Sequence, residues 1–96
     1  MLVVLGDATA APGRRAELVA AARTVASATR EDPGCLCYSF AADLEDPDRI
    51  LSIEIWADRA ALHEHMAHAH TAEFLRAAPE LVAGEPVMSF YDVPAR

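Results

Sequence analysis

The spacing of apolar residues alternates along this chain between a period of two residues and a period of three to four, and this alternation constrains the fold most. A period of two is typical of a β-strand, and the longer period is typical of an amphipathic helix. The pattern predicts elements in the order β-α-β-β-α-β. The predicted strands cover residues 2–10, 35–42, 50–57 and 87–93, and the predicted helices cover 14–30 and a region from about 59 that continues as a second helical piece over 71–78.

Proline, glycine and acidic residues separate these segments. The Asp-Pro-Gly segment at 32–34 ends the first helix, because proline disfavours helical geometry in the residue before it and glycine allows the chain to reverse. The acidic turn at 43–48 predicts a hairpin between the second and third strands. Asp58 is placed to cap the helix that follows it. Pro79 and the Gly-Glu-Pro segment at 84–86 are expected to bring the chain out of the last helix.

This order is that of the ferredoxin-like α+β fold, in which a four-stranded antiparallel sheet carries the helices on one face. Residues 1–96 are expected to form a single domain, since a chain of this length supports one modest core and contains no linker or internal repeat. The third strand has apolar residues on both faces, so the face without helices needs an apolar cover. A second copy of the chain is the simplest cover, which predicts a homodimer through the open sheet face.

The charge of the chain disfavours several kinds of partner. Fifteen acidic residues outnumber eight basic ones, giving a net charge of −7 and a pI near 4.9. Phosphate backbones and anionic membrane surfaces repel such a chain, so we expect no nucleic-acid partner and no membrane association. The first residues carry no basic segment, and no apolar run approaches the roughly 20 residues of a membrane span. These features predict a cytoplasmic protein.

Cys35 and Cys37 are separated by one residue. In a regular strand they would share a face at a separation of about 7 Å, which is too far for an easy disulfide. We therefore expect buried thiols. The alternative is a metal-binding pair, but no second cysteine or histidine pair stands at the spacing of a zinc finger.

Residues 54–74 contain all four histidines and the only tryptophan of the chain. Histidine titrates near neutral pH, and an indole offers a flat apolar wall with one donor, so the segment predicts a pocket for an aromatic, ionisable ligand. A metal site is the alternative. The histidines at 63, 65, 68 and 70 would spread around a helix rather than converge on one point, so no metal ion is predicted.

A set of short motifs follows the predicted frame in order. These are Pro33-Gly34-Cys35, Tyr38, Phe40, Asp46-Pro47, Glu54-Ile55-Trp56, Asp58, Ala61, Leu62, His65, His70 and Phe74. Together they resemble the antibiotic biosynthesis monooxygenase family over nearly the whole chain. The resemblance implies a small dimeric α+β barrel, in a family that includes cofactor-free quinol monooxygenases and haem-degrading enzymes.

The same resemblance implies insertion of oxygen into an electron-rich phenol, hydroquinone or anthrone, with dioxygen as co-substrate and no metal, flavin or other cofactor. The substrate supplies the electrons, so the protein needs a base and a dry aromatic wall. His65 is the candidate base, and His70 is expected to assist it. The alternative for His65 is a structural hydrogen bond at the helix boundary.

Candidate substrate-binding residues surround this base. Alternation along the third strand places Trp56 and Glu54 on the face that the helices are expected to cover. Trp56 is then either a wall for a flat ligand or plain core, and a buried Glu54 needs a partner. The other candidate substrate-binding residues are Phe74, Tyr38, Met66 and Asp7.

One departure from the family pattern keeps other functions open. Several catalytic members carry an asparagine near the end of the first strand, whereas this chain has Gly6-Asp7 there and no asparagine anywhere. A carboxylate cannot donate an amide hydrogen to a substrate oxygen or a peroxide, which disfavours haem degradation. The alternatives are a non-catalytic dimer that binds a quinone-type molecule, and an isomerase or lyase on the same fold.

Overall fold

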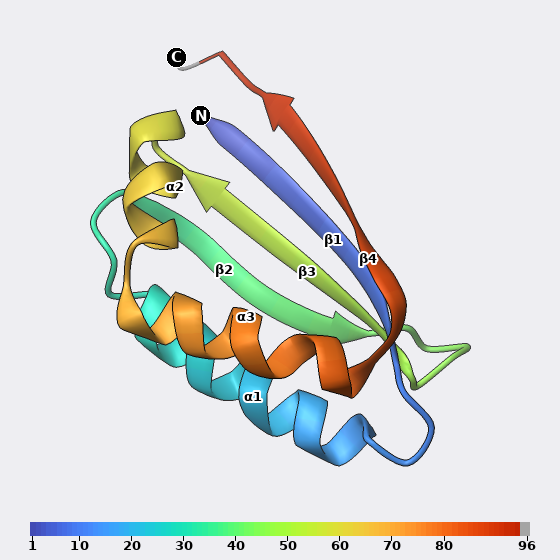
Figure 1. The fold of residues 1–96 in the computed structure, drawn as a ribbon. Helices are drawn as coiled ribbons and strands as arrows, with labels where there is room; N and C mark the ends of the chain where they lie inside the picture. Colours follow the sequence, from blue (N-terminus) through green and yellow to red (C-terminus); the bar gives the residue numbers. More distant parts are fainter. Residues whose placement is uncertain (95–96) are drawn as a thin grey trace.

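The computed structural model describes residues 1–94. Its strands form one antiparallel sheet in the order β2-β3-β1-β4. Figure 1 shows the helices together on one side of this sheet. The ferredoxin-like α+β fold predicted from the sequence is confirmed, with the second helical region divided in two. The elements are β1 (Leu2–Ala10), α1 (Arg15–Thr29), β2 (Cys35–Ala42), β3 (Arg49–Trp56), α2 (Arg59–Met66), α3 (Ala69–Leu81) and β4 (Val82–Asp92).

Two apolar clusters hold the helices against the sheet. In β1 the side chains alternate, so Leu2 and Val4 are buried beneath the helices while Leu5 is exposed on the other face. Leu2 and Val4 belong to a cluster with Val25 of α1 and Trp56 of β3. The second cluster consists of Ala10, Leu18, Ile50 and Leu81. Among the described helices, none is long and apolar enough to cross a membrane.

A β-bulge in β2 changes the faces expected for its first residues. Cys35 pairs with Trp56 and Cys37 pairs with Ile55, so Leu36 is an extra residue in the ladder. The prediction that Cys35 and Cys37 share a face is therefore wrong. Cys35 packs against the cluster around Trp56, whereas Cys37 lies on the face without helices. Leu36 itself is 57% exposed.

The last strand begins earlier than predicted, at Val82 instead of residue 87. α3 continues past Pro79 to Leu81, whose side chain is buried in the second apolar cluster. β4 then pairs at once with β1, and the Gly-Glu-Pro segment at 84–86 falls where the pairing register shifts between Asp7 and Thr9. Gly84 has a φ of 74° there. This segment is thus an irregularity within an edge strand, where proline is tolerated, and does not separate helix from strand.

The loop between α1 and β2 lies directly against α2. The Asp58 side chain accepts a hydrogen bond from the Ala61 N–H at 2.8 Å, which confirms the predicted cap. Gly34 has a φ of 78°, and a Cβ atom at this position would lie 2.6 Å from the Ala61 Cβ. Only glycine allows this approach. It brings the loop that carries Asp32 next to the helix that carries His65.

Candidate active site

A cavity of about 490 Å³ lies between the helix-covered face of the sheet and the helices α2 and α3. Most of its lining is apolar, and it borders both apolar clusters. No arginine or lysine is among the described residues that line it. Apart from Asp7, the polar side chains in the lining are Tyr38, Ser52, Glu54, His65 and Thr71. Such a cavity suits an uncharged ligand of modest size that presents one or two hydroxyl groups.

His65 lies at the wall of this cavity, in the last turn of α2. His65 is 3% exposed, and its ring packs against Trp56 with ring centroids 4.8 Å apart. Its Nδ1 lies 3.1 Å from Asp32 Oδ2 and 3.2 Å from Thr71 Oγ1. Burial lowers the pKa of His65, although the Asp32 carboxylate opposes this effect. The imidazole is therefore neutral at neutral pH, as a general base must be.

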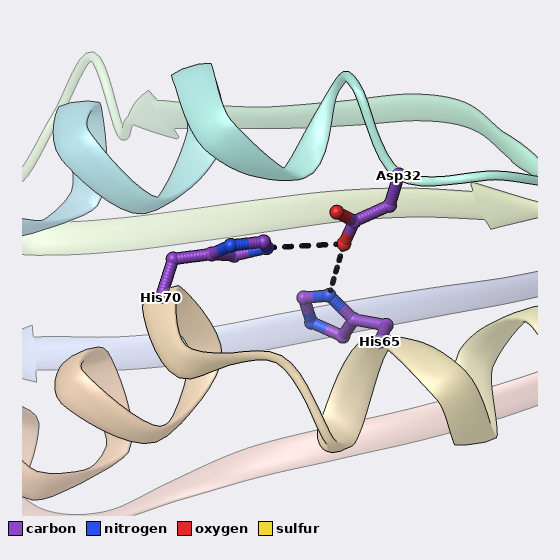
Figure 2. A group of neighbouring side chains, drawn as sticks. All are labelled: Asp32, His65 and His70. Atoms are coloured by element: carbon purple, nitrogen blue, oxygen red, sulfur yellow. Dashed lines mark hydrogen bonds and ion pairs between the residues drawn. The ribbon is translucent and has the colours of Figure 1, made fainter.

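Asp32 orients this imidazole, and Figure 2 shows its carboxylate between the rings of His65 and His70. Burial acts to raise the pKa of Asp32, but the hydrogen bonds from the two histidines outweigh it and hold the pKa below its ordinary value. An ionised carboxylate can only accept, so the proton of His65 lies on Nδ1. Nε2 then carries the free lone pair, and no hydrogen bond from the described residues reaches it.

His70 does not line the cavity, and its ring contacts the Asp32 carboxylate from α3. Its Nε2 donates to the same Asp32 Oδ2 at 3.1 Å, and its ring stacks on that of His68 with centroids 5.0 Å apart. The fourth histidine, His63, is exposed on α2. The two predicted catalytic histidines are thus brought together, but through a carboxylate that the sequence reasoning used only as a helix stop.

Trp56 is not a wall of the cavity, contrary to one of the two roles expected for it. Its side chain is fully buried in the first apolar cluster, one layer behind the lining. Its Nε1–H donates to Glu54 Oε1 at 3.0 Å. Glu54 lines the cavity and is 7% exposed, and burial raises its pKa while the tryptophan N–H opposes the shift. The partner that a buried Glu54 requires is therefore Trp56.

Three of the other predicted substrate-binding residues, Tyr38, Met66 and Phe74, line the cavity. Burial raises the pKa of the Tyr38 hydroxyl well above its usual range, and the Glu54 carboxylate adds to the shift. The phenol therefore stays protonated and can donate to a ligand.

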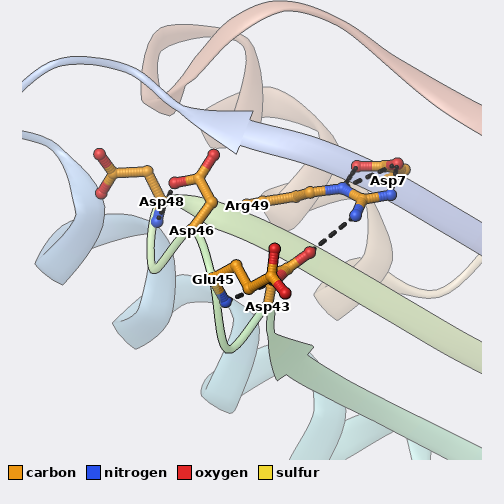
Figure 3. Close-up of polar contacts among 6 residues, drawn as sticks. All are labelled: Asp7, Asp43, Glu45, Asp46, Asp48 and Arg49. Carbon is orange, nitrogen blue, oxygen red and sulfur yellow. Dashed lines mark hydrogen bonds and ion pairs between the residues drawn. The ribbon is translucent and has the colours of Figure 1, made fainter.

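Asp7 borders the cavity, but its carboxylate is turned away from it. Strand alternation puts the Asp7 side chain on the face opposite that of Gly6. Figure 3 shows Arg49 between Asp7 and Asp43, with an N–O distance of 2.6 Å to Asp7 Oδ2 and 2.7 Å to Asp43 Oδ2. The expected contact between the Asp7 carboxylate and a ligand in this cavity does not occur in this geometry.

One known protein is similar to this chain in sequence, and two solved structures are similar to it in fold. The chain is 32% identical over 92 residues to the uncharacterized protein sll1783 of Synechocystis sp., covering 96% of this chain but 63% of that protein. It is 30% identical to PA3566 from Pseudomonas aeruginosa, with a TM-score of 0.89 and coverage of 98% and 94% of the two chains. A crystal structure of an antibiotic biosynthesis monooxygenase superposes with a TM-score of 0.90 at 27% identity, covering 99% and 100%.

The family model described as antibiotic biosynthesis monooxygenase matches residues 1–82. This match includes every element up to the start of β4, and with it the strand and helices that carry Glu54, His65 and His70. The chain therefore belongs to the antibiotic biosynthesis monooxygenase family.

Proposed function

We propose that this protein is a cofactor-independent monooxygenase that oxidises a quinol, an anthrone or a related phenol with dioxygen. The observation that carries the proposal is the pairing of His65 with a buried carboxylate beside an apolar cavity. Asp32 holds the proton on Nδ1, so Nε2 is the acceptor that remains for a substrate hydroxyl. Family membership supports the general reaction class.

The proposed reaction needs only a base and a dry site. His65 Nε2 removes a proton from the substrate, and the resulting anion is electron-rich enough to transfer an electron to dioxygen. One oxygen atom is inserted into the substrate, and the other leaves as water with two hydrogens that the substrate provides. The apolar lining excludes bulk water from the reactive anion.

Glu54 and Tyr38 are proposed to orient the substrate rather than to take its proton. Glu54 has one carboxylate oxygen bonded to Trp56, which leaves the other free to accept from a second substrate hydroxyl. Phe74 and Met66 provide the apolar wall that was expected from Trp56. His70 does not line the cavity, so its assistance to His65 would pass through Asp32.

A second candidate function is binding without catalysis. None of the described residues that line the cavity is an asparagine, glutamine, arginine or lysine, so no side-chain amide or cation faces a developing peroxide. A protein that sequesters a quinone-type molecule would need no such donor. An isomerase or lyase that uses the same histidine is the third candidate.

Oxygen consumption tests the proposal directly. Chelator-treated protein is supplied with a panel of hydroquinones and anthrones, and uptake is corrected for spontaneous autoxidation. We expect protein-dependent uptake of one dioxygen per product formed. Ligand binding without uptake supports the binding function instead, and turnover that continues under anaerobic conditions supports an isomerase or lyase.

We also propose that the protein is a homodimer through the face of the sheet without helices. Apolar side chains line up on this face and remain exposed in the single chain, where Leu5 is 41%, Ile53 42%, Val87 64% and Tyr91 52% exposed. The strand pairing places them on one surface. Ile53 pairs with Leu5, and Val87 and Tyr91 pair with residues two positions from Leu5 in β1, whose side chains point to the same face. An exposed apolar surface of this kind marks an interface.

A charge at the centre of this face should break the dimer. We expect Ile53→Glu to weaken self-association by at least about 2 kcal/mol, or about 30-fold in Kd, because a carboxylate would be buried without a partner. Light scattering over a concentration series measures the effect. Leu44→Glu is the matched control, because Leu44 is fully exposed in the turn between β2 and β3. A monodisperse wild-type monomer at micromolar concentration would contradict the proposal.

A further inference from the structure

The carboxylate of Asp32 is buried among imidazoles and has no other side-chain partner within residues 1–94. The side chain is 6% exposed, and its ion-pair partners are His65, His68 and His70. No arginine or lysine of the described residues reaches it. A buried carboxylate is costly unless a positive charge compensates it. The imidazoles supply hydrogen bonds to Asp32, and a metal cation held by their nitrogen atoms together with the carboxylate would supply the compensating charge.

The donor atoms of this cluster are close enough to share one ion. Asp32 Oδ2, His65 Nδ1 and His70 Nε2 all lie within 4.8 Å of one another, and each nitrogen is 3.1 Å from the oxygen. Tetrahedral zinc has bonds of about 2.0–2.1 Å, which separates its donor atoms by about 3.3 Å. Rotations of the two rings toward a common point would meet this geometry.

Three separate segments carry these donors, as Figure 2 shows. Asp32 comes from the loop after α1, His65 from α2 and His70 from α3. The histidines were expected to spread around one helix, but the break between α2 and α3 turns His65 and His70 toward the same carboxylate. His68 directly precedes α3, and its Nε2 lies 3.7 Å from Asp32 Oδ1, within reach of a fourth position.

We propose that Asp32, His65 and His70 bind one divalent transition-metal ion of the zinc type, with His68 or water as the fourth ligand. Two imidazoles and a carboxylate form a donor set that such ions favour. The ion can enter from solvent, since the side chains of His68 and His70 are 39% and 23% exposed. Neither of these two histidines lines the cavity, so the metal site lies behind the cavity wall.

This site would regulate the proposed function, on which the following step rests. Without metal, His65 keeps its proton on Nδ1 and presents a lone pair at Nε2. A metal ion on Nδ1 takes the place of the Nδ1 proton, and the neutral ring then carries its proton on Nε2. The ring then presents a donor to the cavity and can no longer accept a substrate proton, so occupancy of the site inhibits proton removal.

Metal titration of the purified chain of residues 1–96 tests the site without any substrate. Chelator-stripped protein is titrated with Zn²⁺ by calorimetry, and Co²⁺ is added separately to record its visible absorption bands. We expect one ion per chain, with tetrahedral-type Co²⁺ bands. His70→Ala and Asp32→Asn should each lower the affinity at least about tenfold, since even outer-shell partners contribute that much. His63→Ala is the matched control and should leave the affinity unchanged.

Each outcome decides the proposal. Absence of binding, or Zn²⁺ affinity that is the same in His70→Ala and wild type, overturns it and leaves only a hydrogen-bonded cluster or adventitious surface binding. If Asp32→Asn does not fold, as judged by circular dichroism, His70→Ala alone decides. Oxygen uptake is measured on the metal-free protein, so its absence would end the proposed function while the metal site stands on the titration.

Discussion

Replacing His65 with alanine is expected to lower kcat/KM for the quinol or anthrone by about 10²–10⁴-fold, the range found when a general base is removed. The reason is geometric, because among the four histidines only His65 lines the cavity. The measurement is the initial rate of oxygen uptake in chelator-treated protein at several substrate concentrations. We expect the loss mainly in kcat, since the base acts on a substrate that the apolar walls still bind.

His63→Ala controls for the loss of any histidine from α2. His63 is exposed on the same helix and makes no side-chain hydrogen bond to another described residue. Oxygen uptake by the His63→Ala variant should equal that of the wild-type protein. Uptake that survives in His65→Ala would remove the assignment of His65 as the base and leave the Glu54 carboxylate as the next candidate in the cavity lining.

The order of the elements could be predicted from the sequence because hydrophobic periodicity is a local property. The spacing of apolar residues within each strand or helix indicates which of its faces is buried. The errors lie where a local pattern is interrupted by pairing with another strand. The extra residue Leu36 in β2 and the irregular segment at 84–86 in β4 follow from their register with β3 and β1, which no single segment encodes.

The candidate site could be predicted only in part, for a related reason. The cluster of histidines predicts the segment that carries the site, the family resemblance selects His65 within it, and strand alternation places Glu54 beneath the helices. Asp32 was missed because its place before Pro33 and Gly34 already explains it as a turn residue, and its contact with His65 spans 33 residues. The feature that could have identified Asp32 is an acidic side chain in a turn, at a place where the predicted fold brings that turn against a helix rich in histidine.

How deeply a side chain is buried also could not be predicted from the local sequence pattern. Trp56 was assigned to the correct face, but whether a residue on that face lines a cavity or lies behind it depends on which neighbours cover it. Ala61 of α2 belongs to the same apolar cluster as Trp56, and the imidazole of His65 packs directly on the ring of Trp56. The wall of the cavity is therefore His65, and Trp56 supports it from behind.

Replacing Trp56 with alanine is expected to lower the free energy of unfolding by about 3–5 kcal/mol, the usual cost of removing a large buried aromatic side chain. Trp56 is fully buried and packs against His65 and Tyr38. The loss is a large fraction of the roughly 5–15 kcal/mol that stabilises a typical domain. Denaturant unfolding measures it, provided that the variant is still folded without denaturant.

The pH dependence of this loss separates packing from the hydrogen bond to Glu54. Burial raises the pKa of Glu54 above its ordinary value of 4.5, and the Trp56 N–H opposes that shift. Because the pKa of Glu54 is raised on folding, its contribution to the free energy of unfolding is complete at pH values below the unfolded-state pKa. That contribution is lost as the pH rises through the folded-state pKa, where the buried carboxyl group ionises. Without the indole donor the folded-state pKa of Glu54 rises further, so Trp56→Ala should cost more at about pH 7 than at about pH 4.

Trp56→Phe and a Glu54→Gln background test that account. Phenylalanine keeps much of the ring volume but has no N–H, so it should show the pH-dependent part of the cost with a smaller packing loss. In the Glu54→Gln background position 54 no longer titrates, so the part of the extra cost at neutral pH that comes from Glu54 should disappear for either tryptophan substitution. If the extra cost is undiminished there, the indole N–H does not stabilise the ionised Glu54, and its role in this pH dependence is refuted.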